Sequence, residues 1–140
     1  YERERQPAVY QQAQGYFSAI TDGKYRRILK PIDSSEILVE DKGGKRLDTL
    51  SLSRGTTEQL YLALRFGYIS EFIKHDEPLP VIFDDILVNF DPERKRNSCE
   101  AISRLAESNQ VIFFTCHPET VDALLETSPE AKVIDLENDL

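Results

Sequence analysis

The pattern of apolar and polar positions in the first half of the chain predicts a helix followed by short antiparallel strands. Apolar residues recur at spacings of three and four over residues 2–21, which is typical of a helix with one buried stripe. Pro7 lies in its first turns and Gly23 follows its end, so the regular helix is expected between them. A Gly-Gly hairpin signal at residues 41–44 joins the last two of three strand candidates. The strand candidates are residues 25–29, 36–40 and 46–50.

The pattern changes at Thr56 and predicts alternating helices and strands in the second half. Apolar residues on most faces of the stretch from Thr56 to Ile73 predict a long, largely buried helix. Two short apolar runs without alternation, residues 81–83 and 111–114, are typical of parallel strands covered on both faces. The other expected elements are a helix over 92–107, a shorter helix from Pro118 and a last strand over 133–136. This order predicts an α/β fold with parallel strand pairing.

Composition indicates a folded protein without a membrane partner. The chain has 140 residues, 40% of them hydrophobic, which fits one domain with its own core. No apolar run approaches the roughly 20 residues that span a bilayer. Cys99 and Cys116 make no disulfide framework, so we expect a reducing, cytoplasmic location. The formal charge of −8 argues against a chain that binds nucleic acid over its whole surface, but it allows a local basic patch.

The first polar motif, residues 52–59 (LSRGTTEQ), lies directly before the long helix. Unpaired N–H groups and the positive end of the helix dipole make such a helix start a ready phosphate-binding site. Ordinary capping by Ser53 and a following Glu produces the same pattern, and this interpretation is favoured for the motif alone.

The second polar motif is the carboxylate pair Asp84 and Asp85, which ends the apolar run at residues 81–83. Consecutive strand residues point to opposite faces, so the two acids are expected to have different roles. One would hold a hydrated Mg²⁺, and the other would polarise a water for attack on phosphorus. A solvated strand end explains the pair equally well.

The third polar motif follows the run at residues 111–114, where His117 comes to the same sheet edge as the carboxylates. A neutral imidazole there can hydrogen-bond a phosphate oxygen, although helix capping or packing is the commoner role of a lone histidine. The neighbouring Cys116 is compatible with a metal pair, but no further cluster of Cys and His in the sequence supports zinc.

In their order along the chain, these motifs resemble the C-terminal half of an ABC-type ATPase head. Such heads carry a signature motif, a Walker B strand, a D-loop and a switch histidine in this order. The residues are most similar to the SMC and SbcC class, whose heads are divided by a long coiled coil, and within it to the bacterial YhaN-type branch. The resemblance rests on residues 52–65, 78–91 and 114–118, and it covers about residues 10–136.

The resemblance implies a role for each motif. It implies that the signature residues contact the ATP of the opposite head; these are Ser53, Arg54, Gly55 and Thr56. It implies that Asp84 supports Mg²⁺ through water and that Asp85 and His117 take part in catalysis. It places Asn89 and Asp91 in the D-loop. Arg54 and Thr56 depart from the common signature, and Asp85 stands where most relatives have Glu. The side chain of Asp85 is one methylene shorter, which affects the expected rate more than the role.

The expected fold is therefore α/β, the C-terminal lobe of a P-loop, ABC-type head with parallel strands, a small antiparallel hairpin and an N-terminal helix. Residues 1–23 are expected to end a truncated coiled-coil arm, although an amphipathic helix lying on the domain fits equally well. Residues 24–140 are expected to form the head lobe.

The 140 residues contain no Gly-x-x-x-x-Gly-Lys-Ser/Thr motif, so the phosphate cradle of Walker A is missing. We expect the isolated chain to bind ATP weakly and to hydrolyse none.

The leading hypothesis is an ATP hydrolase half-site in a dimeric machine for DNA repair or chromosome maintenance. It uses ATP and Mg²⁺, and its expected partners are an N-terminal Walker A half, a second identical head, DNA and a nuclease subunit. The alternative is a non-catalytic module for nucleotide-dependent dimerisation. A third hypothesis is a metal-dependent nuclease using Asp84, Asp85 and His117, although two-metal sites need more carboxylates than the sequence offers nearby.

Overall fold

The computed structural model describes residues 7–75 and 77–139, and the chain divides into two units, Tyr1–Leu79 and Pro80–Leu140. The N-terminal helix packs within the first unit. The division after residue 23 into a coiled-coil arm and a head lobe stays a prediction. Each unit has its own core and is described by itself.

The first unit begins with α1 (Ala8–Ile20), as the spacing of apolar residues predicts. Ala13 and Phe17 are buried on one side of the helix. Gly23 has a φ of +74°, and its N–H donates to the Ser18 carbonyl at 2.7 Å, so it ends the helix as predicted. Residues 2–6 of the predicted helix lie outside the described residues.

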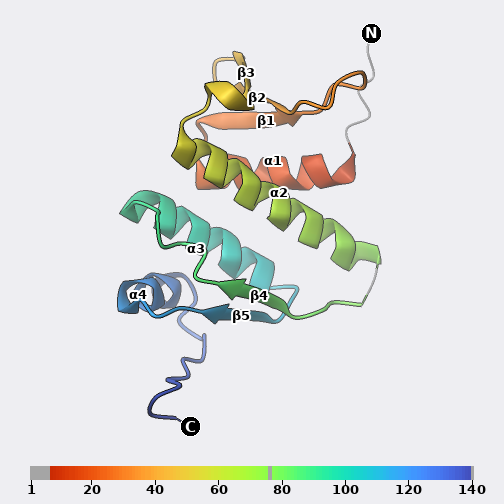
Figure 1. Ribbon diagram of the computed structural model, residues 1–140. Helices are drawn as coiled ribbons and strands as arrows, with labels where there is room; N and C mark the ends of the chain where they lie inside the picture. The colour runs from red at the N-terminus through yellow and green to blue at the C-terminus, as the bar shows by residue number, and fades with distance from the viewer. Residues whose placement is uncertain (1–6, 76, 140) are drawn as a thin grey trace. The chain divides into compact units, whose positions relative to one another are not determined.

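A small antiparallel sheet follows in the order β1-β2-β3 (Figure 1). Its strands are β1 (Tyr25–Leu29), β2 (Leu38–Asp41) and β3 (Arg46–Asp48). The hairpin prediction is confirmed, since Leu38 pairs with Asp48 across it. The last strand ends two residues before the predicted residue 50, because the Asp48 carboxylate accepts the Ser51 N–H at 2.8 Å and starts a 3-10 turn, η1 (Thr49–Ser51).

The long helix α2 (Arg54–His75) crosses α1 at very close range. A Cβ on Gly67 would lie 2.6 Å from the Ala13 nitrogen and 2.6 Å from the Val9 carbonyl oxygen, so only glycine fits at the crossing. The predicted burial on most faces of this helix is wrong for Tyr61, Tyr68 and Phe72, which are exposed. Among the described residues, no helix combines the length and apolar character needed to cross a bilayer.

The second unit contains the predicted parallel strand pair, β4 (Val81–Asp84) and β5 (Val111–Phe114). Val81 lies opposite Val111, and Asp84 lies opposite Phe114. The connecting helix α3 (Pro92–Ala106) packs against both β5 and α4 (Pro118–Thr127) (Figure 1). The predicted α/β fold with parallel pairing is confirmed.

Two sequence predictions for this unit are wrong within the described part of the chain. The strands are covered on one face only: Phe83 is buried, whereas Ile82 is 64% exposed and Phe114 is 47% exposed. The predicted strand at residues 133–136 is not formed, and turns occupy residues 136–138 instead. A strand needs a neighbour for its backbone hydrogen bonds, and the described residues supply none for this segment.

Candidate functional site

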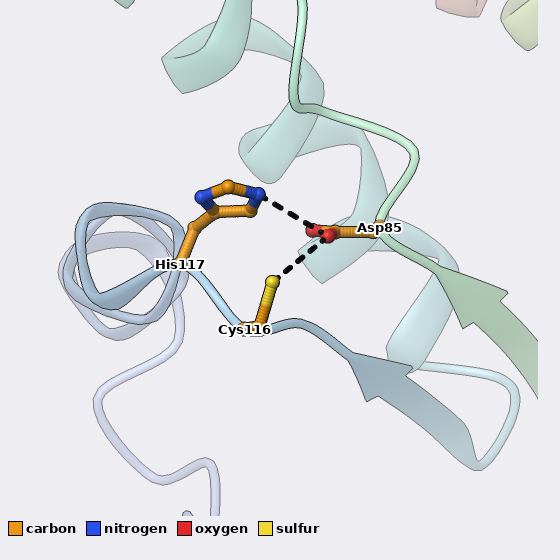
Figure 2. A group of neighbouring side chains, drawn as sticks. All are labelled: Asp85, Cys116 and His117. Atoms are coloured by element: carbon orange, nitrogen blue, oxygen red, sulfur yellow. Dashed lines mark hydrogen bonds and ion pairs between the residues drawn. The ribbon is translucent and has the colours of Figure 1, made fainter.

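Polar residues that follow the two parallel strands meet at one edge of the sheet. Asp85 comes directly after β4, and Thr115, Cys116 and His117 come directly after β5. The Asp85 N–H donates to the Phe114 carbonyl at 2.9 Å, which extends the strand pairing by one residue. Figure 2 shows the side chains of Asp85, Cys116 and His117 pointing toward one another. The sequence predicts that the carboxylates and His117 meet at one sheet edge, and Asp85 does contact His117 there.

The Asp85 carboxylate contacts three side chains from the segment after β5. The Thr115 hydroxyl donates to Oδ1 at 2.6 Å. The other oxygen, Oδ2, lies 3.4 Å from His117 Nε2 and accepts a longer hydrogen bond of 3.7 Å from the Cys116 thiol. The Thr115 Oγ1 also accepts the His117 N–H at 3.1 Å, so Thr115 positions the carboxylate and the histidine together. Sequence reasoning missed Thr115, since a threonine after a strand carries no signal of this contact.

The backbone of Asp85 adopts the left-handed conformation, with a φ of +50°. Few residues other than glycine occupy this region, and aspartate is among those that tolerate it best. The conformation turns the chain sharply at the end of β4. It persists because the backbone N–H and the carboxylate of Asp85 are both held by residues from the neighbouring strand and its loop.

His117 precedes α4 but does not cap it with its side chain. Its backbone carbonyl accepts the Thr120 N–H at 3.0 Å, as the residue before a helix does. Its imidazole lies between two carboxylates, with Nε2 facing Asp85 and Nδ1 lying 3.6 Å from a Glu119 oxygen. His117 therefore occupies the N-cap position of α4 through its backbone, and its half-buried ring makes no capping bond and is available to the site.

Asp84 ends β4 with an exposed side chain, in contrast to the half-buried Asp85. Among residues 7–75 and 77–139, no hydrogen bond or ion pair holds its carboxylate. An exposed, unengaged carboxylate next to a strand end fits the oxygen ligands that hydrated Mg²⁺ prefers. The two neighbouring acids thus have the different surroundings that the strand geometry predicts.

The predicted D-loop residues lie between β4 and α3. Asn89 is exposed, and Asp91 is the N-cap of α3, whose first residue is Pro92. The Asp91 Oδ1 accepts the Arg94 N–H at 3.0 Å, and its Oδ2 lies 3.0 Å from Arg94 Nε. Asp91 thus caps α3, while a contact between heads stays a prediction for both residues.

The signature-like residues form the N-terminus of α2 in the first unit. The Ser53 Oγ accepts the Thr56 N–H at 3.2 Å and lies 2.9 Å from the Thr56 hydroxyl, so Ser53 caps the helix. Ser53 and Arg54 are exposed and Gly55 is half-buried, whereas the Thr56 side chain is buried. An exposed helix start of this kind is compatible with the predicted phosphate contact, and capping does not exclude it.

Comparison with known proteins bears on this arrangement. No protein-family model matches the chain. The chain is 34% identical over 118 residues to the "Uncharacterized protein YhaN" of Bacillus subtilis (strain 168). This match covers 84% of the chain but only 12% of the length of YhaN.

Solved structures of SMC heads are similar in fold. One, from work on ATP-driven dimerization and DNA-stimulated activation of SMC ATPases, has a TM-score of 0.66 at 18% identity, covering 83% of this chain and 71% of that one. The SMC head domain from Thermotoga maritima has a TM-score of 0.62 at 15% identity, and the match covers 88% of this chain and 41% of that one. The Smc head from Pyrococcus furiosus, bound to the C-terminal domain of ScpA, has a TM-score of 0.61 at 19% identity. This match covers 86% of this chain and 30% of that one. The resemblance to SMC-type heads and to the YhaN-type branch is confirmed.

Proposed function

We propose that this chain, which has the fold of the C-terminal lobe of an SMC-type head, completes an ATP hydrolysis site. The other parts of that site would be a Walker A half of the same protein and a second copy of the head. One observation carries the proposal: Asp85 and His117 converge at the carboxyl ends of two parallel strands, 3.4 Å apart. Ligands of α/β sheets bind at this end of the strands.

The chemistry assigned to the site is in-line attack of water on the γ-phosphate of ATP. Thr115 holds one oxygen of Asp85, which leaves the carboxylate oriented to accept a proton from the attacking water. The His117 imidazole, half-buried beside that carboxylate, would hydrogen-bond a γ-phosphate oxygen and sense its loss. Mg²⁺ bound with ATP would neutralise phosphate charge, and the free Asp84 carboxylate would hold it through water.

The signature-like motif would serve the ATP of the opposite head. Ser53, Arg54 and Gly55 lie at the accessible start of a 22-residue helix, where backbone N–H groups and the helix dipole favour a phosphate. Thr56 is buried, so its part would be to position Ser53 through their hydroxyl contact. In this arrangement ATP would join two heads, with Asn89 and Asp91 near the second head, and hydrolysis would release them.

The uncovered sheet face supports the proposal of a missing half. Parallel sheets are normally covered on both faces, yet Ile82 and Phe114 are exposed on one face of this two-stranded sheet. The exposed apolar residues of the segment 133–136 have no neighbouring strand among the described residues. A Walker A half that adds strands and covers this face would bury all of these side chains.

The wider assembly follows from the same reasoning. We propose that α1 continues into a coiled-coil arm and that the complete protein acts with DNA, in repair or chromosome maintenance, together with a nuclease subunit. The relative with the highest TM-score reported above comes from work on ATP-driven dimerization and DNA-stimulated activation, which supports both the second head and DNA as partners.

The proposal is tested by co-expressing the chain with the Walker A half of the same protein and measuring phosphate release. Asp85→Asn should lower the rate by at least about 100-fold, since general-base catalysis contributes about 10²–10⁴-fold. Asp122→Asn makes the same chemical change at an exposed position of α4 and should leave the rate unchanged. The chain without the Walker A half should release no phosphate, and turnover abolished by Asp85→Asn in that sample would contradict the half-site.

Two other outcomes would favour the alternative functions. Nucleotide-dependent dimers without phosphate release would identify a dimerisation module, for which the shorter Asp85 side chain and its engaged oxygens are the supporting observation. Metal-dependent DNA cleavage by the chain alone would identify a nuclease.

A further inference from the structure

Three different metal-binding side chains meet at the sheet edge, although the sequence alone offers only the neighbouring Cys116 and His117. The Asp85 carboxylate supplies a third donor from the other strand. One donor atom from each residue lies within 4.8 Å of the other two. Figure 2 shows the three side chains pointing toward one another. From this geometry we infer that Asp85, Cys116 and His117 form a binding site for a thiophilic divalent cation of the Zn²⁺ class.

Two of the three donor separations are close to those of a zinc tetrahedron. Zinc bonds of about 2.0 Å to nitrogen or oxygen and about 2.3 Å to sulfur, at tetrahedral angles, separate donor atoms by roughly 3.3–3.5 Å. Asp85 Oδ2 lies 3.4 Å from His117 Nε2 and 3.7 Å from Cys116 Sγ. Three protein donors would leave the fourth position to water, as in accessible zinc sites.

Thr115 holds one of the three donors in the orientation that a metal requires, and Glu119 lies near a second. Zinc-ligating histidines typically donate the other ring N–H to a carboxylate, and Glu119 lies 3.6 Å from His117 Nδ1. The Thr115 hydroxyl occupies Oδ1 of Asp85 at 2.6 Å, which leaves Oδ2 facing the other donors. Cys116 is exposed, so an ion can reach the site from solvent.

The donor set distinguishes this site from that of the Mg²⁺ expected with ATP. Thiolate and imidazole favour zinc-like cations, whereas Mg²⁺ prefers oxygen ligands such as the separate Asp84 carboxylate. Binding would release the proton of the Cys116 thiol to solvent, because the thiolate is the ligand. On the premise of the proposed function, an ion held here would occupy Asp85 and His117 together and would stop ATP hydrolysis.

The binding test uses the chain by itself, without nucleotide, so its result does not depend on the proposed function. Zn²⁺ is titrated against a chromophoric chelator, and Co²⁺ is added as a spectroscopic probe. We expect one Zn²⁺ per chain and a sulfur-to-cobalt charge-transfer band. Cys116→Ser and His117→Gln should each weaken Zn²⁺ binding by about tenfold or more, with circular dichroism confirming that both variants fold.

The matched control is His75→Gln, which removes the other histidine of the chain. His75 Nε2 lies 3.1 Å from a Glu71 oxygen at the exposed end of α2, where an adventitious ion would bind. Zinc affinity should be unchanged in this variant. A weaker affinity in His75→Gln, an unchanged affinity in Cys116→Ser, or a Co²⁺ spectrum without the sulfur band would each overturn the inference.

Discussion

Thr115 is the residue on which the geometry around Asp85 depends most directly. Its hydroxyl donates to the carboxylate at 2.6 Å and accepts the His117 N–H at 3.1 Å, so it links both strand ends. We predict that Thr115→Val lowers the phosphate-release rate of the co-expressed head about tenfold or more, since small misplacements of reacting groups have effects of this size. The free energy of unfolding of the chain should fall by about 1.5 kcal/mol, the contribution of a hydrogen bond to a charged group.

The matched control for this prediction is Thr115→Ser, which keeps the hydroxyl and removes only a methyl group. It should retain most of the rate and most of the stability, as measured by phosphate release and urea denaturation. An unchanged rate and stability in Thr115→Val would show that the two hydrogen bonds do not matter, and losses in Thr115→Ser as large as those in Thr115→Val would show that the hydroxyl alone does not maintain the geometry.

Cys99 differs from Cys116 in its surroundings, and this difference predicts a pH effect on stability. Cys99 is fully buried, and burial raises the pKa of its thiol from 9.0 to about 11, with the Lys95 charge opposing and the Glu126 and Glu100 carboxylates adding to the shift. Between about pH 9 and 11, the unfolded chain loses this proton before the folded chain does. The stabilisation is therefore fully present below pH 9 and is lost as the pH rises toward 11.

Urea denaturation at pH 8 and at pH 10.5 measures this effect when it is compared with Cys99→Ala. The wild-type chain should lose more stability between the two pH values than the variant does, because the variant has no thiol to ionise. Equal losses would show that the Cys99 thiol has the same pKa in the folded and unfolded chain.

At pH 8, iodoacetamide should label Cys116 in the folded chain and Cys99 only after unfolding.

At the scale of elements, the crossing of α1 and α2 depends on Gly67. A Cβ at this position would lie 2.6 Å from main-chain atoms of α1, which cannot move aside as a flexible side chain can. Gly67→Ala should lower the free energy of unfolding by about 1–3 kcal/mol, the usual effect of overpacking. Chemical denaturation of the purified chain measures this change.

Gly15 offers a matched control for this substitution, since it lies within α1 as Gly67 lies within α2 but has open space around it. Apart from its own helix backbone and chain neighbours, no atom of the described residues lies within 4 Å of a Cβ built at Gly15. Gly15→Ala should therefore raise the free energy of unfolding by about 0.5–1 kcal/mol, because alanine is the better helix former. A destabilised Gly15→Ala, or a neutral Gly67→Ala, would contradict the close crossing.

At the scale of the whole molecule, the exposed face of the β4–β5 sheet predicts how the chain assembles. Ile82 is 64% exposed in the chain alone and would be buried by the proposed Walker A half. Ile82→Thr keeps a β-branched side chain and should change the stability of the chain alone by less than about 0.5 kcal/mol. It should nevertheless reduce co-purification with the Walker A half severalfold, measured by affinity capture of the tagged half.

The control for assembly is Ile32→Thr, the same substitution at a residue that is 79% exposed in the loop before β2. This variant should co-purify as the wild-type chain does. If both variants bind the Walker A half as well as the wild type, the uncovered sheet face is not the surface that this half covers.

The features that the sequence determined by itself are local ones. Helix periodicity, the Gly23 helix end, the Asp91 cap and the order of the polar motifs all depend on residues within a few positions of one another. Backbone conformation and side-chain capping act over such short distances, so residue identity is enough to predict them. The apolar runs at residues 81–83 and 111–114 likewise predicted the two parallel strands.

Only the tertiary structure decided which residues surround Asp85 and which apolar residues stay exposed. Thr115, Cys116 and His117 are about 30 positions from Asp85 in sequence, and the strand register brings them into contact with its carboxylate. In the part of the chain that the structure describes, one face of the sheet is uncovered and the segment 133–136 has no neighbouring strand. A pattern of strand-forming residues predicts that a segment can form a strand. Whether that segment pairs and is buried depends on the partner that the fold places beside it.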